Sequence, residues 1–357
     1  MNISLFTNQL LKWYPAHRRD LPWRKTKEPY FIWLSEIILQ QTRVAQGLPY
    51  FEVFVERFPT VQDLAAAPEE EVLRCWQGLG YYSRARNLHA CAKEIVRERR
   101  GEFPQTYQEL LKLKGVGPYT AAAIASFAFQ EPVAVVDGNV YRVLARYFGI
   151  ATDIRSGAGK REFERLANEL IPREVPDQYN QAIMEFGALQ CTPHQPDCPA
   201  CPLASACHAF RYGEMKELPV KLGRTKVKSR FLHYFHITCG DKTVVNHRTG
   251  NDIWKGLVDF PLEESESDQR PDPDRSLMLM ELSALNPTVS LEDLPSFKHV
   301  LSHQKLMADF VQVKVSEDRE ADLIRWAERR AYQVVASGKL EEMGKPKLIV
   351  RYLTEQK

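Results

Sequence analysis

The sequence of 357 residues contains no uninterrupted apolar run of about eighteen residues, the length needed to span a bilayer. Its first twenty residues, MNISLFTNQLLKWYPAHRRD, lack the basic start, continuous apolar core and small-residue cleavage site of a secretory signal. No internal repeat is visible, and the one biased stretch is the acidic segment 263–274, which we expect to be a loop. We therefore expect a soluble protein of a reducing, cytosol-like compartment.

Cysteine is scarce outside one short segment, CTPHQPDCPACPLASAC, which spans residues 191–207. This segment holds four of the seven cysteines in the spacing C-x6-C-x2-C-x5-C, namely Cys191, Cys198, Cys201 and Cys207. In a reducing compartment such a group is more typical of a metal site than of disulfides. Four thiolates suit either a tetrahedral zinc ion or an iron–sulfur cluster. We expect the other three cysteines to be packed or free thiols.

The net charge of +2 conceals a difference between the two parts of the chain. Residues 1–230 contain 31 Lys and Arg against 25 Asp and Glu, a net charge of +6. Residues 231–357 contain 17 against 21, a net charge of −4. The first part therefore suits a polyanion such as nucleic acid, although the imbalance alone is also compatible with an ordinary solvated surface.

Apolar periodicity divides the chain at about the same place. Segments with apolar spacing near three and four predict helices up to about residue 215, at 4–14, 30–58, 69–79, 83–100, 106–114, 119–129, 139–148, 160–170 and 179–191. A basic stretch then precedes two pairs of predicted strands, within 231–250 and 299–315, and a helix over 319–336. We therefore predict an all-α domain over 1–218, a basic linker over 219–230 and a smaller α/β domain over 231–357.

The segment LKLKGVGPYTAAAIASF predicts two helices joined by a tight turn. The first helix should end at Gly115, Val116 should pack inward, Gly117 should supply the turn, and Pro118 suits the first position of the next helix. Such a turn directs backbone N–H groups outward, where they can hold a phosphate. A plain corner between helices remains an alternative, because Gly-x-Gly-Pro is also simply a good turn.

Two acidic residues stand in unusual surroundings. Glu36 interrupts the apolar run YFIWLSEIILQQT, where partial desolvation should raise the pKa of its carboxyl group, as a general acid requires. Asp137 lies between PVAVV and GNVYRVLARYF, where it would equally cap a helix. Taken alone, Glu36 is also compatible with an acid on the wet edge of a helix.

Together these motifs resemble those of the helix–hairpin–helix DNA glycosylases that carry a four-iron cluster. Within this group the resemblance is to the adenine DNA glycosylases, which remove adenine mispaired with 8-oxoguanine. It rests on residues 21–42, 76–88, 113–124 and 135–146 together with the cysteine spacing. In the second part, HRTGNDIWKGLVDFP and HVLSHQKL are similar to segments of the family's Nudix-like recognition domain.

The resemblance implies a role for each motif. The four cysteines become ligands of a [4Fe–4S] cluster, and Gly115, Val116 and Gly117 become a DNA-phosphate anchor. Glu36 is implied to protonate the adenine leaving group, and Asp137 to support positive charge on the sugar. That division is chemically sound, because an N-glycosidic bond breaks through an oxocarbenium-like state.

Tyr119 distinguishes two related activities. Bifunctional relatives of the endonuclease III type carry a lysine at this place after the hairpin, and that lysine forms a Schiff base and cleaves the strand. A phenol cannot form an imine, so the resemblance implies a monofunctional glycosylase that leaves an abasic site. We expect Tyr119 to hydrogen-bond Asp137 or the sugar region, with ordinary packing as the alternative.

Further residues are implied to contact the substrate. Gln41 and Tyr81 would fill or wedge the gap around the lesion pair, while Arg24 and Asn139 would lie near the adenine pocket. The recognition loop is Leu301-Ser302-His303, where the family has phenylalanine at the first position, so aromatic stacking is lost while Ser302 and His303 can still hydrogen-bond an oxidised guanine. The same resemblance adds Thr42 and Leu79 to the DNA-contacting set.

The resemblance also implies the partners of the chain. The expected partner is double-stranded DNA with adenine opposite 8-oxoguanine or guanine, and no membrane is expected to be involved. The protein is expected to be a monomer with a cytoplasmic, nucleoid-associated location. The second domain lacks the Arg-Glu-x-x-Glu-Glu spacing of a working Nudix hydrolase, so we expect recognition there and no pyrophosphohydrolase activity. A bifunctional enzyme for oxidised pyrimidines and a non-catalytic iron–sulfur module remain as alternatives.

Overall fold

The computed structural model describes residues 3–223, 227–265, 276–290, 296–301 and 303–356. The chain forms two compact units, and the second includes a segment from the first half of the sequence. Unit 1 consists of residues 1–66 and 87–223, and unit 2 of residues 67–86 and 224–357. Within the described ranges, no helix has the length and apolar character needed to cross a membrane.

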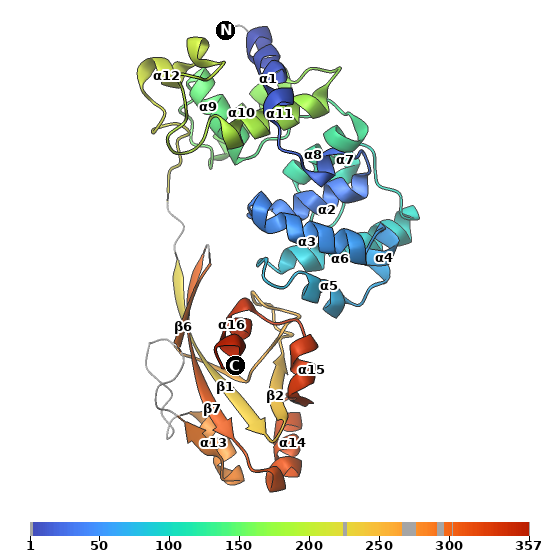
Figure 1. The fold of residues 1–357 in the computed structure, drawn as a ribbon, viewed down its shortest axis with the longest axis vertical. Helices are drawn as coiled ribbons and strands as arrows, with labels where there is room; N and C mark the ends of the chain where they lie inside the picture. Colours follow the sequence, from blue (N-terminus) through green and yellow to red (C-terminus); the bar gives the residue numbers. More distant parts are fainter. Residues whose placement is uncertain (1–2, 224–226, 266–275, 291–295, 302, 357) are drawn as a thin grey trace. The chain divides into compact units, whose positions relative to one another are not determined.

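Unit 1 is built almost entirely of helices (Figure 1). They are α1 (Ile3–His17), α2 (Pro29–Leu39), α3 (Val44–Arg57), α4 (Val61–Ala66), α6 (Ser83–Arg99, which begins in unit 2), α7 (Tyr107–Leu110), α8 (Pro118–Phe129), α9 (Gly138–Phe148), α10 (Gly157–Leu170), α11 (Pro176–Leu189) and α12 (His208–Tyr212). Single 3-10 turns occur at Pro22–Arg24 and Ala204–Ala206. The predicted all-α character of this part is confirmed.

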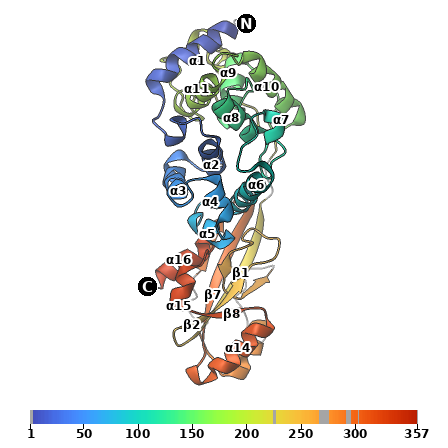
Figure 2. The ribbon, with the colours of Figure 1, turned by 90° about the vertical axis from the view of Figure 1, so that its right-hand side faces the viewer.

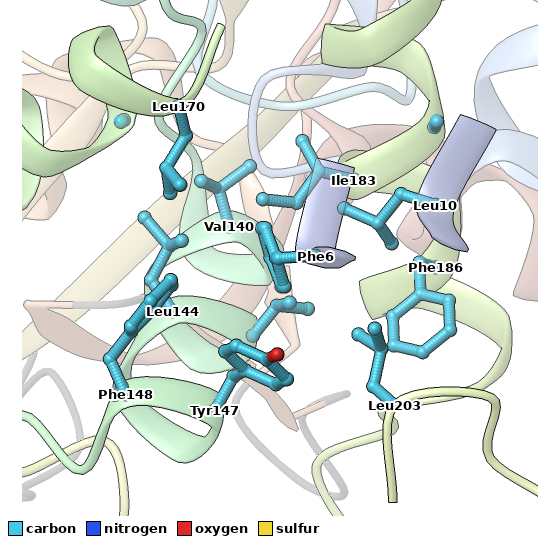
Figure 3. Packing of buried hydrophobic residues seen from close by; sticks show 14 of the residues in the cluster. Phe6, Leu10, Val140, Leu144, Tyr147, Phe148, Leu170, Ile183, Phe186 and Leu203 are labelled. Atoms are coloured by element: carbon cyan, nitrogen blue, oxygen red, sulfur yellow. The ribbon is translucent and has the colours of Figure 1, made fainter. Parts of the chain in front are cut away.

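One hydrophobic core of unit 1 lies between α1, α9, α10 and α11. Phe6, Leu10 and Trp13 of α1 are spaced four and three residues apart, so they form one apolar stripe, and all three are buried. Figure 3 shows Phe6 lying near Val140 of α9 and Ile183 of α11. The same cluster includes partly buried Cys191, Cys201 and Cys207, so the cysteine loop packs directly on this core.

Unit 2 contains a mixed sheet whose two longest strands are parallel neighbours (Figure 2). The strands are β1 (Lys228–Cys239), β2 (Lys242–His247), β3 (Val258–Asp259), β4 (Leu262–Ser265), β5 (Thr288–Ser290), β6 (Ser296–Val300), β7 (Gln304–Lys314) and β8 (Gln333–Ala336). The main order is β3-β2-β1-β7-β5, with β4 on β1, β6 on β7 and β8 on β2. The helices are α5 (Glu69–Cys75), α13 (Leu277–Leu282), α14 (Glu320–Arg329), α15 (Ser337–Glu342) and α16 (Lys347–Glu355), with 3-10 turns at Ser283–Leu285 and Glu317–Arg319.

Alternating side chains of β1 fill two different cores. Phe235 and Ile237 belong to an apolar cluster with residues of α13 and α14. The intervening His236 instead stacks on Phe260 at 4.5 Å and shares a hydrogen bond of 2.9 Å with the Tyr352 hydroxyl of α16. Burial lowers the pKa of His236 to about 4, so this histidine is a neutral core residue at pH 7. The predicted α/β character of the second part is confirmed.

Three element predictions were wrong in detail. The predicted helix 30–58 is two helices, because the Thr42 amide bonds the Leu39 carbonyl in a turn while Gln41 takes a left-handed φ of 56°. The end of the predicted helix 319–336 is strand β8, since Ala331 (φ 57°) stops α14 and the β-branched residues that follow pair with β2. The helix before the hairpin ends at Leu110 rather than at Gly115.

The predicted strand pairs and the acidic stretch have different outcomes. The two strands around the Gly240–Asp241 turn and the two within 299–315 are confirmed. The first residues of the acidic stretch 263–274 belong to β4 rather than to a loop, and its remainder lies outside the described residues. The boundaries 1–218, 219–230 and 231–357 stay a prediction, although β1 already begins at Lys228.

Asn180 fixes the segment that leads to Asp137. Its side chain, 1% exposed, accepts from the Val135 amide at 3.0 Å and donates to the Val133 carbonyl at 2.9 Å and Ser126 Oγ at 2.8 Å. Replacing Asn180 with Ala should lower the free energy of unfolding by about 2–4 kcal/mol, because buried backbone groups lose their partners.

Urea unfolding of the two variants N180A and N168A measures this effect. Asn168 accepts from the adjacent Ala134 amide at 2.9 Å but is exposed, so water replaces its bond and the loss should stay below about 1 kcal/mol. Equal destabilisation of the two variants would contradict the expected role of burial.

Candidate functional site

One pocket of unit 1 brings together most of the residues predicted for catalysis. Its lining includes Glu36 from α2, Tyr119 from α8 and both Asp137 and Asn139 at the start of α9. Arg24 and Thr42, which were predicted to contact DNA, lie in the same lining. The elements that meet here are far apart in sequence, so only the tertiary fold brings these side chains together.

Glu36 is a buried carboxyl group with 7% of the residue exposed. The apolar residues around it on α2 are buried as well, so α2 carries the acid into a region with little water. Burial is the main cause that raises its pKa from 4.5 to about 7, and the Asp137 carboxylate raises it further. Near pH 7 this group therefore holds a proton that it can donate.

Tyr119 lies beside Glu36 and hydrogen-bonds its carboxyl group, while the predicted bond to Asp137 or to the sugar region stays a prediction. Its hydroxyl donates to the Glu36 carboxylate, which by itself lowers the pKa of Glu36. Burial, with both carboxylates nearby, raises the pKa of Tyr119 well above 10, so the phenol stays protonated.

Asp137 is the N-cap of α9. One of its oxygens accepts from the Asn139 and Val140 amides, each at 2.8 Å, and the other accepts from Asn139 Nδ2 at 2.8 Å. Burial raises the pKa of Asp137, while these hydrogen bonds lower it. The capping alternative is therefore confirmed, and it places a fixed carboxylate at the pocket wall.

Sequence reasoning missed a second buried acid in this pocket, Glu185 of α11, which is 0% exposed. It accepts from Arg19 Nη2 at 2.6 Å and from Arg24 Nη2 at 2.7 Å. Burial alone would raise its pKa, but the hydrogen bonds from both arginines lower it to about 2. The signal was the same as for Glu36, a single acid inside the otherwise apolar helix segment AIMEFGAL.

The predicted hairpin has the expected local geometry. Gly115 takes φ 76°, and a Cβ there would lie 2.7 Å from Asn87 Cβ. Val116 is buried with 6% exposed, and Gly117 is the N-cap of α8 without a side-chain cap. The turn thus leaves the N-terminus of α8 without a polar side chain over it, and its role as a phosphate anchor stays a prediction.

All four cysteines of the 191–207 segment line a single cavity of unit 1, and each is free of disulfide bonds. Arg146, 3% exposed, donates to Cys191 Sγ at 3.5 Å and to the Thr192 carbonyl at 2.7 Å. Among the described residues, no three His, Cys, Asp or Glu side chains are grouped so as to hold a metal ion.

Arg142 connects this cysteine loop to the pocket. Its Nε donates to the Cys191 carbonyl at 2.7 Å, and its Nη2 donates to the Gly187 carbonyl at 2.5 Å and to Asn139 Oδ1 at 2.8 Å. Asn139 in turn holds Asp137. The position of the carboxylate is therefore linked by direct hydrogen bonds to the backbone of the first cysteine.

A second pocket lies within unit 2. Leu79 and Tyr81 line it from the turn after α5, and Leu301 and His303 line it from the β6–β7 connection. Tyr81 takes φ 48° and is 40% exposed. Ser302 lies outside the described residues, and the exposed Gln41 is not part of the lining of either pocket.

Comparisons with known proteins match both parts of the chain. Residues 34–173 match the family described as HhH-GPD superfamily base excision DNA repair protein, and residues 233–355 match the NUDIX domain. A non-covalent endonuclease III–DNA complex is 27% identical, with a TM-score of 0.52 over 59% of this chain and 96% of that one. The fold and these matches define a base excision DNA repair protein with an appended Nudix-like domain.

Two curated relatives narrow the assignment. Adenine DNA glycosylase of Homo sapiens is 37% identical over 82% of this chain, which spans only 55% of the human protein. Adenine DNA glycosylase of Buchnera aphidicola subsp. Schizaphis graminum is 33% identical over 85% of this chain and 86% of the relative. The chain belongs to the adenine DNA glycosylase family.

The buried Glu36 carboxyl should make stability depend on pH. Its pKa is about 7 in the folded protein against an ordinary 4.5, so the folded state holds the proton more tightly and stability falls as the pH rises from about 4.5 to about 7. The variant E36Q cannot ionise. The free energy of unfolding of E36Q minus that of the wild type should therefore increase by about 3 kcal/mol between pH 4.5 and pH 7, which corresponds to the rise of the Glu36 pKa from 4.5 to about 7.

Urea unfolding at pH 5 and pH 8 measures the difference. Replacing Glu164, an exposed acid on α10, with Gln provides the control and should give a difference that does not change with pH. A difference between E36Q and the wild type that is equal at both pH values would show that Glu36 is not desolvated.

Proposed function

We propose that this protein is a monofunctional DNA glycosylase that hydrolyses the N-glycosidic bond of adenine mispaired with 8-oxoguanine, or with guanine. The observation that carries the proposal is the pairing of two carboxyl groups in one pocket, in which Glu36 has a raised pKa of about 7 and Asp137 is fixed by three hydrogen bonds. Adenine must leave the base stack to reach such a pocket, and a mismatch lowers the cost of extrusion.

Glu36 and Asp137 divide the chemistry of bond cleavage. The Glu36 carboxyl group gives its proton to the adenine ring as the bond between C1′ and the base breaks, so adenine leaves as a neutral molecule. Positive charge then develops at C1′ and O4′ of the sugar, where the Asp137 carboxylate stabilises it. The Tyr119 hydroxyl holds the Glu36 carboxyl group in place through its hydrogen bond.

Hydrolysis is completed when water attacks C1′. The Glu36 carboxylate formed in the first step accepts the proton of that water, which restores the acid for the next cycle. By analogy with retaining glycosidases, Asp137 can form a transient bond to C1′ that water then displaces. Tyr119 cannot form an imine with C1′, so strand cleavage through a Schiff base is not part of the proposed reaction.

Recognition of the opposite base is assigned to the unit 2 pocket. Tyr81 is exposed at the end of a turn and offers a flat ring to the base stack, while Leu79 and His303 lie in the same lining. Leu301 supplies an apolar surface where the family has phenylalanine, which weakens stacking on the oxidised base. The proposed substrate is duplex DNA. The protein is proposed to act on it as a monomer, at a cytoplasmic and nucleoid-associated location.

Cys191, Cys198, Cys201 and Cys207 are the proposed ligands of a [4Fe–4S] cluster. All four thiols line one cavity, and burial raises the pKa of the Cys201 thiol to about 11, so a bound cation is needed to keep it as a thiolate. Such a cluster, when bound, is a redox-capable centre that cross-links the loop. Arg146, through Cys191 Sγ and the Thr192 carbonyl, and Arg142, through the Cys191 carbonyl, would hold the loop against α9 around it.

Single-turnover cleavage of duplexes with adenine opposite 8-oxoguanine, guanine and thymine tests the proposal. We expect adenine release from the first two, with strand breaks only after alkali and little adduct trapped by borohydride. The variants E36Q and D137N should slow release at least about 100-fold, since each removes a group that acts in the transition state. Full activity of D137N, or no adenine release by the wild type, would refute the assignment.

Elemental analysis tests the cofactor. The purified protein should contain about four iron atoms and four sulfides with broad visible absorbance, and C201S should lose them. The control C75S replaces a cysteine of α5 outside this cavity and should keep the cluster. One zinc ion without sulfide would contradict the cluster.

A further inference from the structure

The turn that carries Leu79 and Tyr81 adopts a conformation that needs support. Gly78 and Gly80 take φ of 103° and 75°, and Tyr81 takes 48°, in the left-handed region that non-glycine residues rarely occupy. Such a conformation persists only when surrounding contacts fix it. Part of the support is local, because Trp76 Nε1 donates to the Gly80 carbonyl at 3.0 Å.

The other support comes from a residue near the end of the chain, Lys345. Gln77 Oε1 accepts from the Lys345 amide at 3.0 Å, and the Tyr82 hydroxyl donates to the Lys345 carbonyl at 3.2 Å. The Tyr82 hydroxyl also accepts from the Gly78 amide at 3.4 Å. The backbone amide of Lys345 thus binds Gln77, just before the turn 78–82, and its carbonyl binds Tyr82 at the end of that turn.

The side chain of Lys345 explains how its backbone is held in place. The residue is 4% exposed, and its ammonium group donates to three carbonyls, those of Leu340 at 2.5 Å, Glu341 at 3.1 Å and Met343 at 2.7 Å. These bonds close the segment 340–345 into a tight loop. A buried ammonium group is costly unless it is fully hydrogen-bonded, so this loop has few alternative conformations.

The same loop is joined to the rest of the unit 2 pocket. The Gly344 carbonyl accepts from the Val258 amide of β3 at 2.9 Å, and Lys347, two residues after Lys345, lies in the pocket lining with Trp254. The loop therefore contacts the turn on one side and the strand that follows Trp254 on the other. Neither Gln77 nor Lys345 is itself part of the lining.

We propose that Gln77 and Lys345 are positioning residues for recognition of the base opposite adenine, and that they act by holding Leu79 and Tyr81 in the unit 2 pocket. This inference rests on the proposed function. Lys345 shapes the loop 340–345 through its ammonium group, and its backbone clamps the turn. Gln77 completes the clamp with a hydrogen bond, so its loss should loosen recognition while the carboxyl pair of unit 1, which keeps its own hydrogen bonds, is untouched.

The test compares Q77A with the conservative variant Q77E, whose carboxylate can still accept from the Lys345 amide. For each protein, the dissociation constant and the single-turnover rate are measured with adenine opposite 8-oxoguanine and opposite guanine. In Q77A the preference for 8-oxoguanine should fall about two- to tenfold, the range expected for one net hydrogen bond, while the rate at saturating enzyme opposite guanine changes less than about twofold. In Q77E the preference should be restored.

K345M and K339M form a matched pair. Both remove one ammonium group, but Lys339 is exposed on α15 and pairs with Glu342, whereas Lys345 is buried. K345M should lose at least as much of the preference for 8-oxoguanine over guanine as Q77A does, and K339M should keep the wild-type preference. If K345M does not fold, the comparison of Q77A with Q77E decides alone.

The outcomes separate this inference from the proposed function. A wild type that releases adenine without any preference between the two opposite bases removes the recognition role of the unit 2 pocket, and the inference falls with it. If the wild type shows a clear preference and Q77A shows the same preference, the positioning role of Gln77 and Lys345 is wrong, while the proposed function stands. Equal loss in Q77A and Q77E would assign the effect to general destabilisation, which also overturns it.

Discussion

The geometry of the pocket that holds Glu36 and Asp137 depends on the close approach of α9 and α11. Gly187 of α11 faces Asn139 so tightly that a Cβ would lie 2.6 Å from Asn139 Cβ, and this approach lets Arg142 reach the Gly187 carbonyl, Asn139 and the Cys191 carbonyl at once. A bulkier residue at Gly187 would separate the helices, and the guanidinium could not satisfy three segments. The capped Asp137, the cysteine loop and the pocket wall therefore share one packing constraint.

Neighbouring hydrogen-bond donors give the three pocket acids different pKa values. Burial acts on Glu36, Asp137 and Glu185 in the same direction, toward protonation. Glu36 receives a hydrogen bond from the Tyr119 phenol and keeps a raised pKa, whereas Glu185 receives hydrogen bonds from two arginines and has a pKa of about 2. Burial raises the pKa of Asp137, and the hydrogen bonds of the helix cap oppose that rise. The fold thus assigns acid and anion roles by neighbours rather than by residue type.

The sequence predicted those features that are encoded locally. The helices of unit 1, the hairpin glycines and the cap at Asp137 each depend on residues a few positions apart, so composition and spacing were sufficient. The break after Leu39 and the strand at 333–336 were missed because they depend on a left-handed residue and on pairing with β2. Glu185 and the partner of Tyr119 were missed because contacts between residues distant in sequence define them.

Each of the two units of the chain forms one of the two pockets on its own. The pocket with Glu36 and Asp137 is formed wholly by unit 1, and the pocket with Tyr81 and His303 wholly by unit 2. The segment 67–86 is early in the sequence but packs with the second unit, so the turn with Tyr81 is stabilised both by Trp76 and by the loop 340–345. Under the proposed function, substitutions in unit 2 can therefore change the base preference while the carboxyl pair of unit 1, with its own hydrogen bonds, keeps the same chemistry.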